Sequence, residues 1–408
     1  MEFPKKITTI QTAIITASSI IGTALMTVAR EIVEEVNTMA PLIIIGGVLV
    51  ALFAVWIICQ LGKSYSGKSI FQYSELIIGK PGSIPLGTGG DPSQKESDTV
   101  KIVEVVGRTI DDAWENLEQQ ISLPLFMGHL RVLVVSEEFA NAGLGTFGDF
   151  LKRSPQIRRT AWMLVAEGTA DQYMELDPEL QRIPALYLVT AIDEAIRIGK
   201  FPEEYLGIAW SKNASLGREP ILPYVSIKAN GNLEISGLAY FNQEKLVGTT
   251  KAIEVGRYMA IMGIHPAGYS VLLPYPEQDV TIMFNSVKRK SKIKIEMNNG
   301  LPHLKVRVHV DGEIEEVISE DFKVNTETIP DIEKQLAKNA KESFITLIKK
   351  TQTDQSDIFG FGEHVRAKER SYWNKNIRTK EKWLELYKDL PVDVEVTASI
   401  KRVGMKNE

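Results

Sequence analysis

The pattern of apolar and polar positions divides the chain at about residue 83. The stretches Ile7–Ala29 and Ala40–Leu61 carry no charged residue, and nothing comparable follows Ser83. At about 1.5 Å rise per residue, either stretch is long enough to cross a hydrocarbon core of about 30 Å. The sequence therefore predicts two N-terminal transmembrane helices within residues 1–80, followed by a multi-domain α+β region of mixed β-sheets packed with helices.

Gly, Pro and Ser recur in residues 81–99, as is typical of a flexible linker. Residues 100–212 are predicted to form a first domain in which helices alternate with apolar strands. The expected helices are Ile110–Ile121 and Ile183–Ile198, and the expected strands are Leu130–Val135 and Ala161–Ala166. This alternation indicates a sheet covered by helices.

Residues 213–275 have a different pattern and are predicted to form a small second domain. The strands Ile221–Ile227 and Leu233–Phe241 flank Asn230-Gly231, which is a strong hairpin signal. A helix is expected from Thr250 to Met262.

Residues 276–408 are predicted to form a C-terminal α+β domain. Strands are expected over Val280–Val287, Lys292–Met297 and Leu304–Val310, with turns at Asn298–Gly300 and Asp311-Gly312. A long amphipathic helix begins at Thr328 and ends near Asp354, since Thr, Pro and Asp are favoured at its start. The strand Val392–Arg402 is expected to return to the same sheet.

Charge and cysteine content exclude several kinds of site. The chain has 47 basic and 52 acidic residues, and this acidic balance gives no support for nucleic-acid binding. Cys59, the one cysteine, excludes an intrachain disulfide and any multi-cysteine zinc site.

Lysines flank the apolar stretches. Lys5 and Lys6 precede the first, and Lys63 and Lys68 follow the second, so the positive-inside rule places both flanks in the cytoplasm. A two-helix hairpin would then leave the rest of the chain on the same side. One span plus an interfacial first helix is the alternative, because the first stretch is rich in hydroxyl side chains.

Two phosphate-loop patterns occur outside their usual context. Gly62–Ser69 (GKSYSGKS) matches GxxxxGK[ST], but it follows an apolar span and not a strand. Gly143–Gly148 (GLGTFG) matches GxGxxG, but Ser136–Ala142 separates it from the preceding strand. We interpret the first as the exit from a membrane span and the second as a loop or helix end.

The remaining search for catalytic chemistry is negative. The histidines His129, His265, His303, His309 and His364 form no HExxH motif, and GxSxG is absent. His303 and His309 share a strand face, but no carboxylate is spaced to complete a metal site. We predict no catalytic, cofactor-binding or metal-binding residues and no cofactor, and the sequence identifies no ligand-binding residue.

The most distinctive string is Asp354–His364, DQSDIFGFGEH. Phe359–Gly362 after a helix indicates a glycine-assisted helix C-terminus with aromatic anchoring, which Tyr372 and Trp373 would extend. A packing clamp is favoured over a ligand pocket. We interpret the neighbouring Arg366, Lys368 and Arg370 as a solvated helix face.

Most of the chain resembles the Ger(x)C spore germination proteins, the lipoprotein C subunits of nutrient germinant receptors. The segment Asp357–Trp373 and the closing VDVEVTASIKRVG strand resemble the C-terminal domain of that family, and Pro124–Ala140 and Gly237–Gly248 resemble earlier parts of it. The resemblance covers about residues 100–405. It implies assembly with the receptor A and B subunits at the spore inner membrane, an indirect response to small nutrients, and no enzymatic turnover.

Residues 1–80 resemble a different family, the receptor B subunit of the amino acid permease superfamily. The similar segments are Ser18–Ile32 and Gln60–Pro81. The chain thus resembles a truncated B subunit fused to a truncated C subunit, as a deletion product, an engineered product or an artefact of gene prediction. The C family's lipobox cysteine and first strands are absent, so the domain from Lys101 is expected to have an exposed sheet edge. Family C subunits also lie outside the membrane, opposite to the side that the lysines predict.

The leading hypothesis is a non-enzymatic, membrane-attached component of a nutrient germinant receptor. The alternatives are a transporter-derived protein that binds an amino acid or ion, and a non-functional fusion of the B and C subunits. A nucleotide-binding enzyme is a more distant third, because both phosphate-loop patterns lack their context.

Overall fold

The computed structural model describes residues 102–402, apart from residues 122–124, 177–182, 276–279, 320–321 and 323. The chain divides into two units, Met1–Thr99 and Val100–Glu408, and all described residues belong to the second. The two predicted spans, the linker and Cys59 lie outside the described residues. Within the described part, no helix is both long enough and apolar enough to span a membrane.

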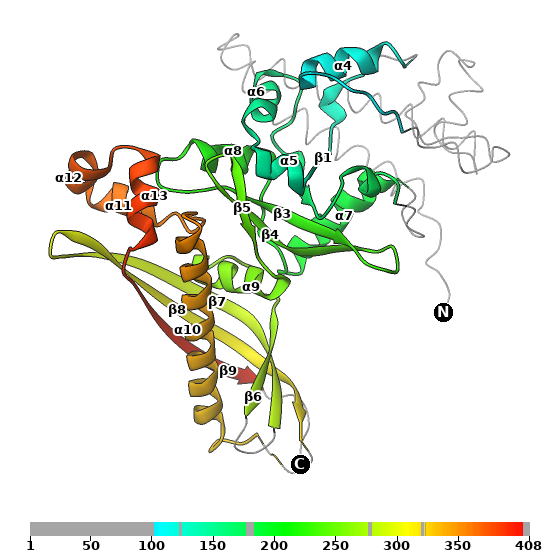
Figure 1. Cartoon of the computed structure of the whole chain (residues 1–408). Coiled ribbons are helices and arrows are strands. Elements are labelled where there is room, and N and C mark those ends of the chain that lie inside the picture. Colours follow the sequence, from blue (N-terminus) through cyan, green and yellow to red (C-terminus); the bar gives the residue numbers. More distant parts are fainter. Residues whose placement is uncertain are drawn as a thin grey trace, which may run out of the picture. The chain divides into compact units, whose positions relative to one another are not determined.

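The first sheet has five strands in the order β1-β2-β3-β4-β5. Strands β1, β2 and β3 run parallel to one another, whereas β4 pairs antiparallel with both β3 and β5 (Figure 1). The strands are β1 (Val132–Ser136), β2 (Trp162–Ala166), β3 (Ile221–Ile227), β4 (Leu233–Asn242) and β5 (Lys245–Thr249). The sheet therefore mixes parallel and antiparallel pairs, and it draws strands from both 100–212 and 213–275, which the sequence divides into two domains. Those domain boundaries stay predictions.

Helices cover both faces of this sheet, as the alternation of helices and strands predicts. Every residue of β2 is buried, which is typical of a strand that is covered on both sides. Trp162 and Leu164 pack with Ile192 of α7 in one cluster, while Met163 and Val165 belong to a second cluster with residues of α6 and α8. The helices of this part are α4 (Ile110–Glu118), α5 (Glu137–Ala142), α6 (Gly145–Arg153), α7 (Pro184–Arg197) and α8 (Leu206–Ala214).

The hairpin between β3 and β4 confirms the prediction at Asn230-Gly231. Ile227 pairs with Leu233, and Gly231 has a positive φ of 79°, which glycine adopts without steric cost. The sequence does not predict the short strand β5 that follows β4, nor the helices α5, α6 and α8.

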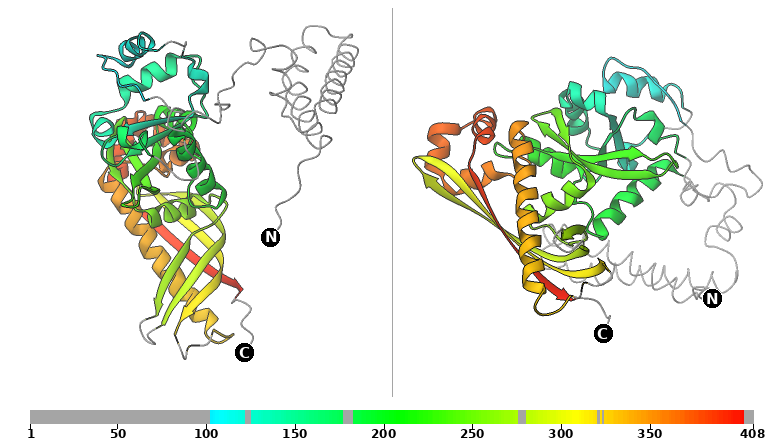
Figure 2. Two further views of the ribbon diagram at one scale, coloured as in Figure 1. Left: turned by 90° about the vertical axis from the view of Figure 1, so that its right-hand side faces the viewer. Right: turned by 60° about the horizontal axis from the view of Figure 1, so that its bottom comes forward.

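The second sheet has four strands in the order β6-β7-β8-β9. They are β6 (Ser270–Tyr275), β7 (Val280–Asn298), β8 (Leu301–Ile318) and β9 (Val392–Arg402). The long helix α10 (Ile329–Thr353) lies along one face of this sheet (Figure 2). It belongs to the crossover from β8 to β9, which pair in parallel, and the predicted return of the last strand to the same sheet is confirmed.

The predicted turn at Asp311-Gly312 is wrong. Both residues lie inside β8, and Val280–Val287 and Lys292–Met297 are parts of one strand, β7. The other predicted turn, Asn298–Gly300, is confirmed: Asn299 and Gly300 have φ of 51° and 79°, as expected for a two-residue hairpin. Gly312 lies next to a β-bulge and directly against the ring of Phe284. The absence of a side chain at Gly312 therefore allows this close contact and does not mark a reversal of the chain.

Helix α9 (Ala252–Met262) connects the two sheets, because it packs against β4 of the first and against β7 and β8 of the second. One core accordingly contains Tyr240 of β4, Met259 of α9 and Val306 of β8. The chain between α10 and β9 forms a helical segment at one end of the second sheet (Figure 1). It comprises α11 (Phe361–Lys368), α12 (Arg370–Tyr372), the π-helical turn η7 (Trp373–Ile377) and α13 (Lys380–Lys388).

Candidate functional site

The distinctive string Asp354–His364 joins α10 to α11 around one buried carboxylate. The Asp357 side chain is fully buried and accepts hydrogen bonds from the Phe361 N–H (3.1 Å), the Gly362 N–H (2.8 Å) and the indole Nε1–H of Trp383 (3.0 Å). Burial raises the pKa of Asp357 to about 6, while these three donors act in the opposite direction. Asp357 therefore fixes the start of α11 and ties it to α13.

The glycines of this string act at a different place from the one predicted. Helix α10 ends at Thr353, and the residue in the left-handed conformation after it is Gln355, with φ of 50°. Gly360, with φ of 72°, instead precedes the first residue of α11. The prediction of a glycine-assisted end of α10 is therefore wrong, because the string begins a new helix after a seven-residue connection, Asp354 to Gly360.

Aromatic side chains surround Asp357 as the packing-clamp interpretation expects. The rings of Phe359 and Phe361 stack at 5.2 Å between centroids, and those of Trp373 and Trp383 lie 5.7 Å apart. All four side chains are buried, with 3% or less of their surface exposed. They fill the space around the carboxylate, so this geometry is that of a clamp and not of an open pocket.

The residues around 218 connect this clamp to the first sheet. Arg218 Nη2 donates to the hydroxyl of Tyr258 (3.0 Å), and its Nε donates to the carbonyl of Ile358 (3.3 Å). Glu219, which is fully buried, lies 3.2 Å from Lys380 Nζ through its Oε2 atom. Burial raises the pKa of Glu219 to about 7, although the nearby lysine acts against the shift. We call Arg218, Glu219, Asp357, Lys380 and Trp383 the junction cluster.

A second buried ion pair lies near the junction cluster. Lys212 Nζ pairs with Glu204, and both side chains are more than nine-tenths buried. Burial is the main cause of both shifts, since it raises the pKa of Glu204 and lowers that of Lys212 to about 8. Each partner thus depends on the other to remain charged inside the protein.

The junction cluster is built for packing. A general base has to reach its substrate, yet Asp357 is enclosed by three protein donors, and Glu219 is enclosed with Lys380. His364 is half-buried, and its pKa is lowered mainly by burial. Arg366, Lys368 and Arg370 are exposed, as predicted for a solvated helix face.

The stretch Gly143–Gly148 is a helix end, as favoured from sequence. Gly143 caps the C-terminus of α5, and α6 begins at Gly145. The carboxylate of Glu244 lies against Gly145, where an anionic phosphate would be repelled.

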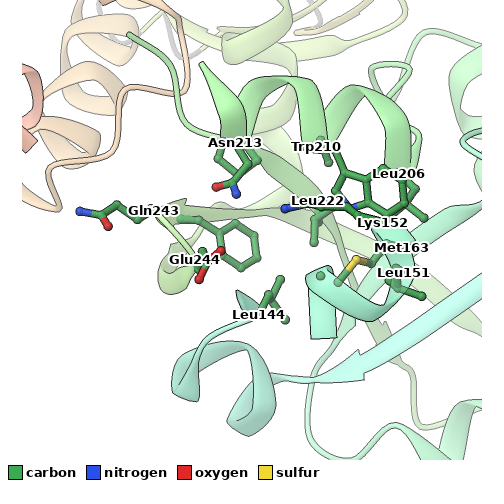
Figure 3. A pocket seen from close by; sticks show the side chains of 14 residues that line it. Leu144, Leu151, Lys152, Met163, Leu206, Trp210, Asn213, Leu222, Gln243 and Glu244 are labelled. Atoms are coloured by element: carbon green, nitrogen blue, oxygen red, sulfur yellow. The ribbon is translucent and has the colours of Figure 1, made fainter. Parts of the chain in front are cut away.

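Leu144 and Gly148 line an apolar cavity with an empty volume of about 480 Å³, open solvent included. Figure 3 shows Trp210, Met163 and Leu151 gathered on one side of this cavity, with Gln243 and Glu244 on the other. The wall is mainly apolar, and its carboxylate, Glu244, would repel a phosphate. The other phosphate-loop pattern, Gly62–Ser69, lies outside the described residues.

The two histidines of β8 pair with separate carboxylates. His303 Nε2 lies 3.0 Å from Asp393, and His309 Nε2 lies 3.1 Å from Asp311. Within the described ranges no group of three or more His, Cys, Asp or Glu residues could hold a metal ion.

Comparison with known families now places the chain. Residues 236–404 match the family described as spore germination B3/GerAC like, C-terminal, and residues 77–227 match the spore germination protein N-terminal domain. Residues 77–227 and 236–404 are thus similar to the two domains of the GerAC spore germination proteins. Residues 6–88 match a further family, the spore permease family, described as spore germination protein. The resemblances found in the sequence are thereby confirmed for both parts of the chain.

Individual relatives cover most of the chain. The putative spore germination protein YfkR of Bacillus subtilis (strain 168) is 26% identical over 78% of this chain and 83% of its own length. Spore germination protein GerQC of Bacillus cereus is 24% identical over 73% and 82%, and spore germination protein KC of Bacillus subtilis is 23% identical over 86% and 90%.

The fold is similar to that of a solved protein. The crystal structure of GerBC aligns with a TM-score of 0.52 at 19% identity, over 70% of this chain and 83% of that one. This likeness concerns the fold alone. It agrees with the mixed α+β architecture of two sheets.

The boundary between the two GerAC matches falls in the β3–β4 hairpin. It therefore lies inside the five-stranded sheet. At the other side of this sheet β1 is an edge strand, since it pairs only with β2 among the described strands.

Sequence reasoning identifies the Asp357 string but not the charged residues that it meets. Arg218 and Glu219 are adjacent, whereas Lys380 lies 161 residues after Glu219. The local signal that could have found the first two is their position directly before the apolar strand Ile221–Ile227.

Proposed function

We propose that this chain is a non-enzymatic, membrane-attached component of a nutrient germinant receptor that acts in spore germination. The observation that carries the proposal is the pair of GerAC matches, which together extend over residues 77–404. The relatives that align over most of their length are named as spore germination proteins.

The enclosed junction cluster supports a role without turnover. Its carboxylates are used to hold α11 and α13 to the first sheet, so they are not free to transfer protons to a substrate. We infer that the chain assembles with the receptor A and B subunits, and that small nutrients affect it only indirectly.

Membrane attachment is proposed through residues 1–80. The match of residues 6–88 to the spore permease family supports this proposal, and so do the uncharged stretches Ile7–Ala29 and Ala40–Leu61. We propose the spore inner membrane as the location. We further propose that the chain is a fusion of B-subunit and C-subunit segments, tested by sequencing the locus and its transcript.

Deletion of the gene tests the receptor role. We expect spores without it to lose the response to one class of nutrient, measured as release of dipicolinic acid, and to regain it when the full chain is supplied. Complementation with a chain that lacks residues 1–80 tests attachment, and we expect it to fail although the protein accumulates. Normal nutrient-triggered germination after deletion would contradict the proposal.

A transporter-derived amino acid or ion-binding protein is the second candidate, because residues 6–88 match a permease family. A midplane binding site in such transporters is built from several helices, whereas the sequence predicts two. Saturable binding of a radiolabelled amino acid that survives deletion of residues 100–408 would favour this candidate.

A further inference from the structure

A groove opens between α9, α10 and the sheet β6–β9, away from the junction cluster. Its empty volume is about 990 Å³, open solvent included. Most of its wall is apolar and comes from the sheet and α10, with Phe284, Val310, Leu336, Phe344 and Val396 among its members. Arg257 and Arg289 also line it, and among the described residues no acidic side chain does. The groove is thus apolar with two cations.

A β-bulge brings Arg289 into this groove. Before the bulge the buried residues of β7 are even-numbered, up to Ser286; after it the buried residue is Arg289. Ser286 pairs with Gly312 and Lys288 pairs with Asp311, so Val287 is the extra residue. Beyond it, odd-numbered residues of β7 take the face that even-numbered residues occupy before it. In a regular strand without the bulge, Arg289 lies three positions after Ser286 and would point to the other face of the sheet.

Arg289 is a buried cation without a carboxylate partner among the described residues. It is 2% exposed, and its Nη1 and Nη2 donate to the carbonyls of Gly256 (3.1 Å) and Pro266 (2.9 Å). Its Nε has no acceptor. A guanidinium carries five N–H groups, so three remain without a hydrogen bond. Burial lowers the pKa of Arg289 to about 10.

An uncompensated charge in such a place is costly, and proteins rarely keep one without a partner. If Arg289 only stabilised the fold, its Nε–H would remain buried without a hydrogen bond, because the two backbone carbonyls accept only from the terminal nitrogens. A bound anion would satisfy the remaining donors and supply the missing charge.

We propose that this groove binds a small amphiphile, with an anionic carboxylate at Arg289 and an apolar body along α10 and the sheet. Arg257 lies on α9 one residue after Gly256 and adds a second positive charge. The polar side chains of Ser286 and Ser343 offer hydroxyl groups within an otherwise apolar lining. Leu272, which is 57% exposed, continues the apolar surface along β6. The arrangement fits the general plan of ligand pockets, which are apolar with few polar anchors.

Octanoate is a suitable probe, because it has one carboxylate and an unbranched apolar body. We expect the full chain to bind it in a 1:1 complex by isothermal titration calorimetry. Octanamide, with the same body and no charge, should bind at least about tenfold more weakly, as expected for the loss of one charge-assisted hydrogen bond. Acetate, which has no apolar body, should give no measurable heat. The heat from partitioning of each probe into detergent is the same for all variants, and it is subtracted from each titration.

Substitutions at two positions test the anion-binding arginine and the apolar wall of the groove separately. Arg289→Met should remove the preference for octanoate over octanamide, and Arg289→Lys should keep part of it. Ala340→Phe on α10 should block the groove and abolish binding of both probes. Thr346→Phe, at an exposed position of the same helix, is the control and should bind as the wild-type protein does.

Thermal unfolding of the ligand-free protein gives a second readout that does not depend on binding. Because Arg289 has no counter-ion within the part of the chain that the structure describes, Arg289→Met is expected to fold with a melting temperature equal to or above that of the wild-type protein. The proposal is overturned if wild-type protein does not bind octanoate, if Arg289→Met keeps the preference, or if Ala340→Phe binds as tightly as Thr346→Phe does.

Discussion

Gly217 and Gly362 touch backbone to backbone. A Cβ built on Gly362 would lie 2.5 Å from the Cα of Gly217 and equally close to the indole of Trp383. Two hydrogen bonds fasten the same contact, from the Glu363 N–H to the Gly217 carbonyl (3.2 Å) and from the Gly217 N–H to Glu363 Oε1 (2.9 Å). Glycine at both positions therefore lets the loop before β3 lie directly on α11.

Gly362→Ala tests this close approach. We expect it to lower the free energy of unfolding by about 2–4 kcal/mol, since the methyl group has no room and overpacking forces the backbone apart. Urea unfolding followed by tryptophan fluorescence measures the change. Gly148→Ala is the control: its Cβ would have ordinary contacts, so we expect no loss and a gain of up to about 1 kcal/mol from helix propensity. Equal stability of the two variants would show that the contact can relax.

Glu219 makes stability depend on pH. Its pKa is raised from 4.5 in the unfolded chain to about 7 in the folded protein, so between these values the folded state binds more protons than the unfolded state. The free energy of unfolding should therefore be largest below about pH 4.5 as far as this group is concerned, and fall as the pH rises to about 7.

Urea unfolding of the wild-type protein and Glu219→Gln at pH 5 and pH 8 checks this dependence. Asp357 contributes with the same sign at lower pH in both proteins, so the difference between them isolates Glu219. We expect a smaller decline in the variant. Parallel pH profiles would mean that Glu219 ionises normally.

Removing one partner of the buried pair Glu204 and Lys212 should destabilise the protein more than replacing both partners by apolar residues. Lys212→Met leaves the Glu204 carboxylate buried without its partner, and we expect a loss of about 3–5 kcal/mol. The double variant Glu204→Leu with Lys212→Met removes both charges and should recover a large part of that loss. Denaturant unfolding of the wild-type protein, both single variants and the double variant gives the coupling energy, and a simple sum of the single effects would contradict the buried pairing.

Asp357→Asn should loosen the clamp around α11. An amide offers one acceptor oxygen in place of two and points a donor at groups that already donate, so we expect a loss of about 1–3 kcal/mol. The emission of Trp383 should also change, because its indole loses a hydrogen bond. Asp389→Asn, at an exposed position, serves as the control, and similar losses in the two variants would count against the proposed role of Asp357.

Local patterns predict most of the regular elements of the described region. The strands Ile221–Ile227 and Val392–Arg402 and the helix Ile329–Thr353 are found as predicted or within a residue or so, because alternation, caps and amphipathic spacing are local properties. The helices α5 and α6 are short, with six and nine residues, and offer too few turns for a clear period.

Long-range relations are harder to obtain from one sequence. An Asp-Gly pair such as Asp311-Gly312 is typical of a turn, yet the strand continues here: the pair lies opposite the bulge at Val287, and Gly312 allows close contact with Phe284. Likewise, Arg289 stands among alternating lysines and would be assigned to a solvated face. Only the reversal of strand parity at Val287 buries it, and that reversal depends on the pairing partner.

The β3–β4 hairpin has a consequence for how such genes can change. The two GerAC matches meet within it, so a break at residues 228–235 would separate the paired strands β3 and β4 and divide the core that Met163 and Leu222 share with Phe241 and Leu246. Neither fragment could close its own core. Recombination that exchanges one half for a divergent counterpart would have to preserve the complementary surfaces on both sides of the cut, and the halves are therefore expected to be inherited together.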